Sequence, residues 1–126
     1  MYIITDNGKA AFLNYILNKS IPSTLKLHLY KNSVTLSTSL ILSNITENNE
    51  TGYNAISLLP NDWTVNAGSA SFPQQKFSFT APATIYGYYI TDANNTILIL
   101  INALNDPVVL PSIGGDVLVT PSLSLL

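Results

Sequence analysis

Short runs of alternating apolar and polar residues recur along most of this chain, and residues typical of turns separate them. Leu25, Leu27 and Leu29 alternate with polar neighbours, and Phe77 and Phe79 do so further along the chain. A period of two places every second side chain on one face of a strand. The pattern therefore predicts an all-β fold.

The other strand candidates continue from about residue 24 to the C-terminus. They are Val34 to Leu36 with Leu40 to Leu42, Tyr53 to Leu58, Trp63 to Val65, Ile85 to Tyr89, Thr96 to Ala103, Val108 to Leu110, and Val117 to Leu125. Roughly eight or nine short strands at this spacing predict a jelly-roll-like antiparallel β-sandwich. No repeat or linker divides the chain, so we expect a single domain over residues 1–126.

One segment near the N-terminus has the periodicity of a helix instead. We expect this short α-helix over about residues 8–18, with Thr5 or Asp6 as its cap. The i,i+4 pairs that form its apolar face are Phe12 with Ile16 and Leu13 with Leu17. Pro22 disfavours helical geometry at the residue before it and should end the segment.

Charged residues are scarce and exclude several functions. They make up 10% of the chain, the net charge is −2, and arginine is absent. Nucleic-acid binding needs clustered cations, so we expect no nucleic-acid partner. The chain has no cysteine and one histidine, which excludes disulfides, thiolate chemistry and a multi-histidine zinc site. We therefore expect no enzyme activity, cofactor, metal or small-molecule substrate.

We also expect no membrane partner and no targeting segment. The longest apolar run, Ile97 to Ile101, is far shorter than a membrane-spanning helix. The first residues lack the basic and apolar regions of a signal peptide. Asn, Ser and Thr dominate the polar residues and leave the surface nearly neutral, which favours association with other proteins.

The titratable residues show no catalytic pattern. His28 falls on the polar phase of its strand, and a general base would need a nucleophile and an orienting acid beside it. We expect a surface or interface histidine. The carboxylates lie among Asn, Gly and Pro, where turn formation is their usual role. They are Asp6, Glu47, Glu50, Asp62, Asp92, Asp106 and Asp116.

Gly87 interrupts an aromatic strand. A glycine inside a strand often marks a bulge or a close backbone approach. Tyr86 and Tyr88 should share one face of that strand and Tyr89 the other. We interpret these rings as core or interface residues. The alternative is a sugar-binding face that includes Trp63, as in a carbohydrate-binding module.

Several segments in this order resemble small structural proteins of tailed bacteriophages, common among aquatic phages. The segments are Leu13 to Leu17, Leu25 to Asn32, Thr46-Glu47, Thr51-Gly52-Tyr53, Asp62 to Val65, Ile85 to Asp92, Val109 to Pro111, and Val117 to Pro121. The Glu47 with Gly52-Tyr53 pair and the Tyr86-to-Asp92 block are the most specific. The resemblance spans nearly the whole chain and implies a virion component with a β-sandwich body.

From this resemblance we expect a capsid decoration (cement) protein on the capsid surface of the virion, assembled in the host cytoplasm. Its partners would be the major capsid protein and copies of itself, as a trimer at a local symmetry axis. A tail, baseplate or fibre position is the alternative. The interface candidates are Tyr2, Ile3, Ile4, Tyr86, Tyr88, Leu123, Leu125 and Leu126.

Overall fold

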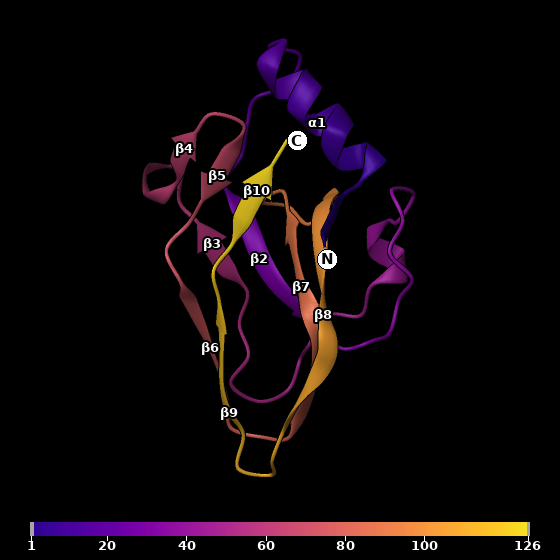
Figure 1. The fold of residues 1–126 in the computed structure, drawn as a ribbon, viewed down its shortest axis with the longest axis vertical. Helices are drawn as coiled ribbons and strands as arrows, with labels where there is room; N and C mark the ends of the chain where they lie inside the picture. The colour runs from indigo at the N-terminus through magenta and orange to yellow at the C-terminus, as the bar shows by residue number, and fades with distance from the viewer. Residues whose placement is uncertain (1, 126) are drawn as a thin grey trace.

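The computed structural model describes residues 2–125 and consists mainly of antiparallel strands (Figure 1). The elements are β1 (Tyr2–Ile4), α1 (Asp6–Ile16), β2 (Leu25–Tyr30), β3 (Ile56–Leu58), β4 (Thr64–Asn66), β5 (Ser69–Ser71), β6 (Gln75–Phe79), β7 (Ala83–Thr91), β8 (Leu98–Leu110), β9 (Gly115–Val119) and β10 (Ser122–Ser124). Two single-turn 3-10 helices cover Leu42–Asn44 and Pro60–Asp62.

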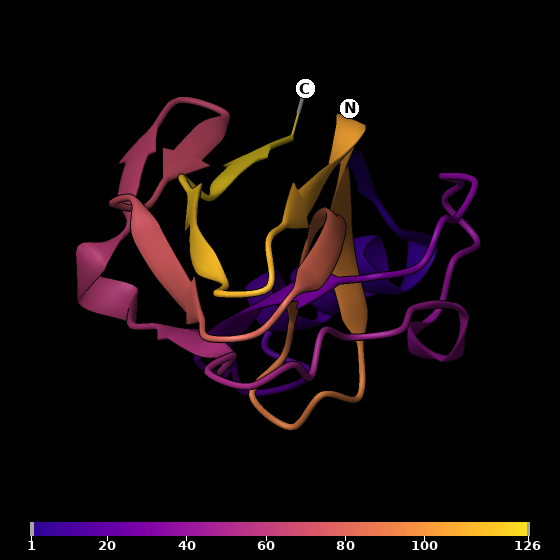
Figure 2. The same ribbon diagram turned by 90° about the horizontal axis from the view of Figure 1, so that it is seen from below.

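The strands form two layers around one core. The larger layer is a five-stranded sheet in the order β1-β8-β7-β2-β3. The strand groups β10-β5-β4 and β6-β9 face it across the core (Figure 2). Side chains from both layers meet there, including Leu27 and Ile90 from the large sheet and Phe77 from β6. This arrangement confirms the predicted all-β antiparallel sandwich with one short helix.

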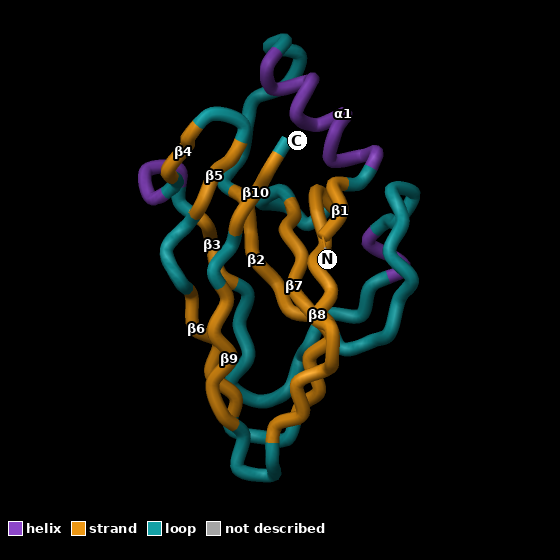
Figure 3. Tube along the Cα trace, in the orientation of Figure 1, coloured by secondary structure: helices purple, strands orange, loops and turns teal. Residues whose placement is uncertain are grey.

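Helix α1 lies across one end of the sandwich (Figure 3). It begins two residues earlier than expected because the Thr5 side chain accepts a hydrogen bond from the Gly8 N–H at 3.0 Å. The same hydroxyl donates to the Leu98 carbonyl, so the cap also fastens the helix to β8. The helix ends before Pro22, since Asn18 adopts a left-handed conformation with φ of 58°.

The helix does not bury its predicted apolar face. Its buried residues are Gly8 and Ala11. A Cβ at Gly8 would lie 2.2 Å from the Ile99 carbonyl oxygen, so the helix backbone approaches β8 too closely for any larger residue. Leu13 and Ile16 consequently remain exposed. The expectation that the i,i+4 pairs mark the buried face of the helix was wrong, because the small residues Gly8 and Ala11 form the contact with β8.

The segment between β2 and β3 also differs from the prediction. The expected strand around Val34 to Leu42 is absent, and the chain there is mostly irregular. Its apolar side chains, such as Leu36 and Leu42, pack on the outer face of the large sheet against Tyr30 and Ile101. The apolar residues of this segment therefore cover the outer face of the sheet, and the segment itself does not pair as a strand.

Gly87 produces the predicted irregularity in β7. The β7–β8 register shifts between Ile85 and Gly87, and β8 carries extra residues opposite this point. The two apolar runs expected as separate strands are consequently one strand, β8. The shift also reverses the side-chain alternation. Tyr88 enters the central core, whereas Tyr86 packs with the cluster on the outer face. The expectation that both rings share one face was wrong.

Candidate functional site

His28 lies at the centre of a buried polar cluster. Its side chain projects from β2 to the outer face of the large sheet, yet the residue is only 1% exposed. Nδ1 lies 2.7 Å from the Glu47 carboxylate, and Nε2 lies 2.9 Å from the Thr91 hydroxyl. The ring stacks on Tyr89 with centroids 4.6 Å apart. The expectation of a surface histidine was wrong, because the segment after β2 covers this face.

Glu47 connects this cluster to the central core. The carboxylate lies beside β2, beyond the point where pairing with β3 ends. It accepts a hydrogen bond of 2.5 Å from the Tyr53 hydroxyl, which itself accepts from the Leu29 N–H at 3.1 Å. The Tyr53 ring stacks on Phe77 in the core. One carboxylate therefore joins the outer face of the sheet to its inner face.

Two of the segments named in the sequence analysis meet in this cluster. Glu47 and Tyr53 come from the Glu47 with Gly52-Tyr53 pair, and Tyr89 and Thr91 come from the Tyr86-to-Asp92 block. Gly52, next to Tyr53, has a φ of 96°. A left-handed conformation of this kind favours glycine. These residues thus have an architectural role: they fix an irregular segment against the sheet.

Glu47, His28 and Thr91 place a carboxylate, an imidazole and a hydroxyl in a row, which is also the order of groups in a nucleophilic catalytic site. Here the hydroxyl belongs to Thr91, which is fully buried and also contacts the Asp92 carbonyl and the Asn95 side chain. Thr91 and His28 line neither the pocket beside β1 and Ser124 nor the pocket beside Lys31 and Glu50. The Thr91 hydroxyl is therefore closed to a substrate in this structure.

Hydrogen bonding holds the pKa of three carboxyl groups low. Burial alone would raise the pKa of Glu47, but the hydrogen bonds from His28 and Tyr53 outweigh it and leave the pKa below 4.5. At Asp92 burial is likewise outweighed by hydrogen bonds from Thr96 and Ile97, which lower the pKa. At Glu50, hydrogen bonds outweigh the effect of burial in the same way.

These lowered pKa values predict acid destabilisation. Each carboxyl group binds a proton less readily in the folded state than in the unfolded state. The contribution of the ionised group to the free energy of unfolding is complete above its pKa in the unfolded chain, about 4 to 4.5. It is lost as the pH falls through the lower pKa of the folded state. We expect the urea-unfolding free energy to fall steadily from about pH 5 to about pH 3. Glu47→Gln should make this fall with pH shallower. An unchanged dependence of the free energy on pH would contradict the lowered pKa of Glu47.

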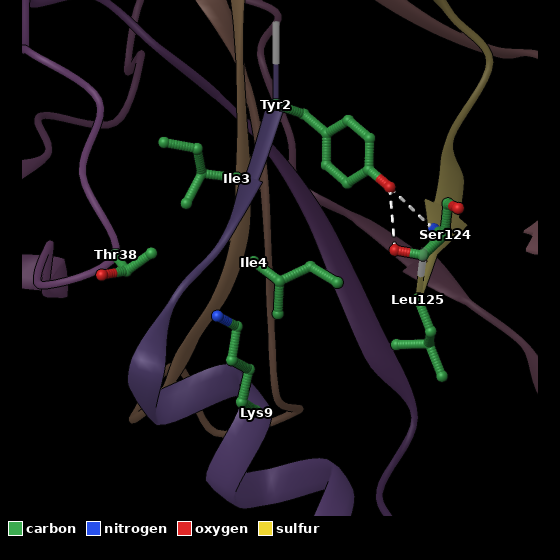
Figure 4. A pocket seen from close by; sticks show the side chains of 7 residues that line it. All are labelled: Tyr2, Ile3, Ile4, Lys9, Thr38, Ser124 and Leu125. Atoms are coloured by element: carbon green, nitrogen blue, oxygen red, sulfur yellow. Dashed lines mark hydrogen bonds between the residues drawn. The ribbon is translucent and has the colours of Figure 1, made fainter.

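A pocket of about 500 Å³ lies between β1 and the segment Ser124-Leu125. Figure 4 shows the side chains that line it, from β1, the first turns of α1, a loop and the end of the chain. They are Tyr2, Ile3, Ile4, Lys9, Thr38, Ser124 and Leu125. The Tyr2 hydroxyl donates to the Ser124 carbonyl and accepts from the Ser124 N–H, both at 2.9 Å. Four of the predicted interface residues thus lie together.

The other predicted interface residues are placed differently. Tyr88 is buried in the central core, which removes it from the surface, and Tyr86 is partly buried on the opposite face. Leu123 packs against the core. Leu126 lies outside the described residues. Sequence reasoning missed Lys9 and Thr38, because no local pattern places them beside β1.

The aromatic residues proposed for sugar binding do not form a common face. Trp63 packs edge-on against Phe72 at the side of the central core, with ring centroids 5.1 Å apart. Tyr88 lies within that core, and Tyr89 is buried under His28. A flat exposed platform of these rings, which sugar stacking requires, is therefore absent from the described structure.

A separate apolar surface follows helix α1. Its exposed side chains, with their exposed fractions, are Leu13 (59%), Ile16 (76%) and Leu17 (62%), and their i, i+3, i+4 spacing places them on one face of the helix. We call these three residues the apolar ridge. Large apolar side chains that gather on a surface in this way often mark a protein contact.

The His, Asp and Glu side chains of residues 2–125 form no group of three that could hold a metal ion. Within the same residues, no helix has the length and apolar character needed to span a membrane. Comparison with known proteins adds no relative: neither a protein-family model nor a curated protein matches the chain.

Proposed function

We propose that this chain is a non-enzymatic structural protein of a bacteriophage virion that decorates the capsid exterior. The observation that carries this proposal is the apolar ridge. Helix α1 contacts β8 through Gly8 and Ala11, and this orientation leaves Leu13, Ile16 and Leu17 uncovered. Burying one such side chain contributes about 1.5–3 kcal/mol. A neighbouring protein surface would provide that burial.

The character of the contact follows from the composition. Only 10% of the residues are charged, so salt bridges can contribute little to association. Apolar burial and backbone hydrogen bonds would provide most of the stabilisation. The partners that we propose are the major capsid protein and further copies of this chain, arranged as a trimer at a local symmetry axis of the lattice.

Particle heat resistance tests this role. Particles stripped of the chain should lose their contents at a lower temperature than intact particles. Adding back the purified chain should restore the resistance, whereas Ile16→Asp should not, because it places a charge on the apolar ridge. Asn14→Asp is the matched control, since it adds the same charge at an exposed position of the same helix. Equal heat resistance of stripped and intact particles would contradict the cement role.

A further inference from the structure

Strand β1 has one edge that pairs with no described strand. On its other side it pairs with β8, and the Thr5 N–H continues this ladder by donating to Ile99 at 3.0 Å. Hydrogen-bonded pairs alternate along an antiparallel ladder. Ile3 therefore bonds to β8, whereas the N–H and C=O of Ile4 point away from it. No described residue on the free side forms a hydrogen bond with these two groups.

Strand β10 faces this edge across the pocket. Hydrogen bonds from Phe72 to Pro121 and from Leu125 to Gly68 fix its ladder with β5. By the same alternation, the backbone groups of Ser124 point toward β1, where the Tyr2 hydroxyl meets them. The Tyr2 side chain and its hydrogen bonds to Ser124 together span the gap between β1 and β10. This gap is therefore wider than the spacing of about 4.8 Å between paired strands. We call this gap the seam.

The seam has the dimensions and chemistry of a peptide site. Its pocket of about 500 Å³ lies within the usual range of about 300–1,000 Å³ for ligand pockets. Ile4 and Leu125 provide apolar walls, and Lys9 projects into it from helix α1 (Figure 4). Lys9 forms no ion pair with any described residue. A carboxylate in the seam would supply the missing counter-charge.

We infer that the seam binds an extended acidic segment of a partner protein, which adds as a strand along the free edge of β1. The apolar side chains of the segment would contact Ile4 and Leu125, and its carboxylate would pair with Lys9. Strand addition of this kind uses backbone hydrogen bonds for affinity and pockets for specificity. β1 and β10 run in the same direction, so one segment can run antiparallel to both (Figure 4).

The geometry favours a single extended segment over a second folded copy. β10 borders the seam opposite β1, and the loop at Thr38 closes against the start of the helix through a 2.8 Å hydrogen bond from the Asp6 N–H. The edge of another sheet would have to displace these elements. A single extended chain would displace the Tyr2 hydroxyl from Ser124 and leave β10 and the Thr38 loop in place.

Titration of the full chain with synthetic peptides tests this inference. The probes are blocked peptides of about seven residues, the length of a typical strand, with alternating valine and threonine. One series carries a glutamate at each position in turn, and a matched series carries lysine instead. We expect amide signals of β1 and α1 to shift with the glutamate series, and Lys9→Glu to weaken that binding about tenfold. Lys9→Gln should weaken it less.

A proline variant tests the backbone pairing directly. Ile4→Pro removes the N–H that faces the seam and leaves the β8 ladder intact, as proline does at a strand edge. Ile4→Ala removes more of the apolar side chain than proline does but keeps the N–H, so peptide binding should be weakened in the alanine variant and lost in the proline variant. Melting temperatures of both variants confirm that each is folded.

Three results would overturn the inference. They are no peptide binding up to about 1 mM, binding that Ile4→Pro and Lys9→Glu leave unchanged, and a dimer of this chain that Ile4→Pro dissociates. Peptide binding in solution is independent of where the chain lies in a particle, so this test can fail while the proposed function stands.

Discussion

Gly87→Ala should remove a large part of the stability of this protein. A Cβ at position 87 would lie 1.9 Å from the Asn102 carbonyl oxygen and 2.9 Å from the Tyr30 ring. Both neighbours are held by the central strands of the large sheet, so the clash cannot be relieved locally. We expect a loss of more than about 4 kcal/mol in the urea-unfolding free energy, against a typical total of about 5–15 kcal/mol.

Ser57→Ala provides the comparison for this variant. Ser57 is exposed on β3, at the edge of the same sheet, and its replacement should change the free energy by no more than about 0.5 kcal/mol. If Gly87→Ala lowered the urea-unfolding free energy as little as Ser57→Ala does, β8 could not approach β7 at the bulge as closely as described.

His28→Ala should be the second most damaging change. It removes a fully packed ring from Tyr89 and leaves the Glu47 carboxylate and the Thr91 hydroxyl without their imidazole partner. Truncating a large buried side chain and leaving buried polar groups unpaired each destabilise a protein. We expect a combined loss of about 3–5 kcal/mol in the urea-unfolding free energy.

Glu47→Gln separates the charge from the packing in this cluster. The amide keeps the size of the side chain and can still accept a hydrogen bond from Tyr53. Its cost should therefore be about 1–2 kcal/mol, clearly below that of His28→Ala. A change of less than about 0.5 kcal/mol for His28→Ala would indicate an exposed histidine and contradict the buried cluster.

Local sequence patterns predicted the elements whose stability comes from regular pairing or capping. The alternation of Leu25 to Leu29 gave β2, the apolar run after Thr96 marked β8, and Gly87 marked the bulge. Thr5 was one of two expected helix caps and is the residue that caps α1. Each of these signals is visible within a few neighbouring residues of the sequence.

The features that the sequence did not reveal depend on contacts between distant segments. His28 has the polar phase of an exposed strand residue, and only the segment near Glu47, 19 positions away, buries it. The seam brings Tyr2 to Ser124 across 122 positions. Most of the predicted apolar face of α1 is exposed because a close backbone approach selects Gly8 rather than the larger apolar residues.

Cryo-electron microscopy of the intact virion that contains this chain tests the proposed function most directly. The account predicts regular density for the sandwich over the capsid surface, with the apolar ridge of Leu13, Ile16 and Leu17 against a neighbouring subunit. Density confined to the tail, baseplate or a fibre would contradict the decoration role and leave a structural role elsewhere in the virion. Absence of the chain from the particle would contradict the virion function altogether.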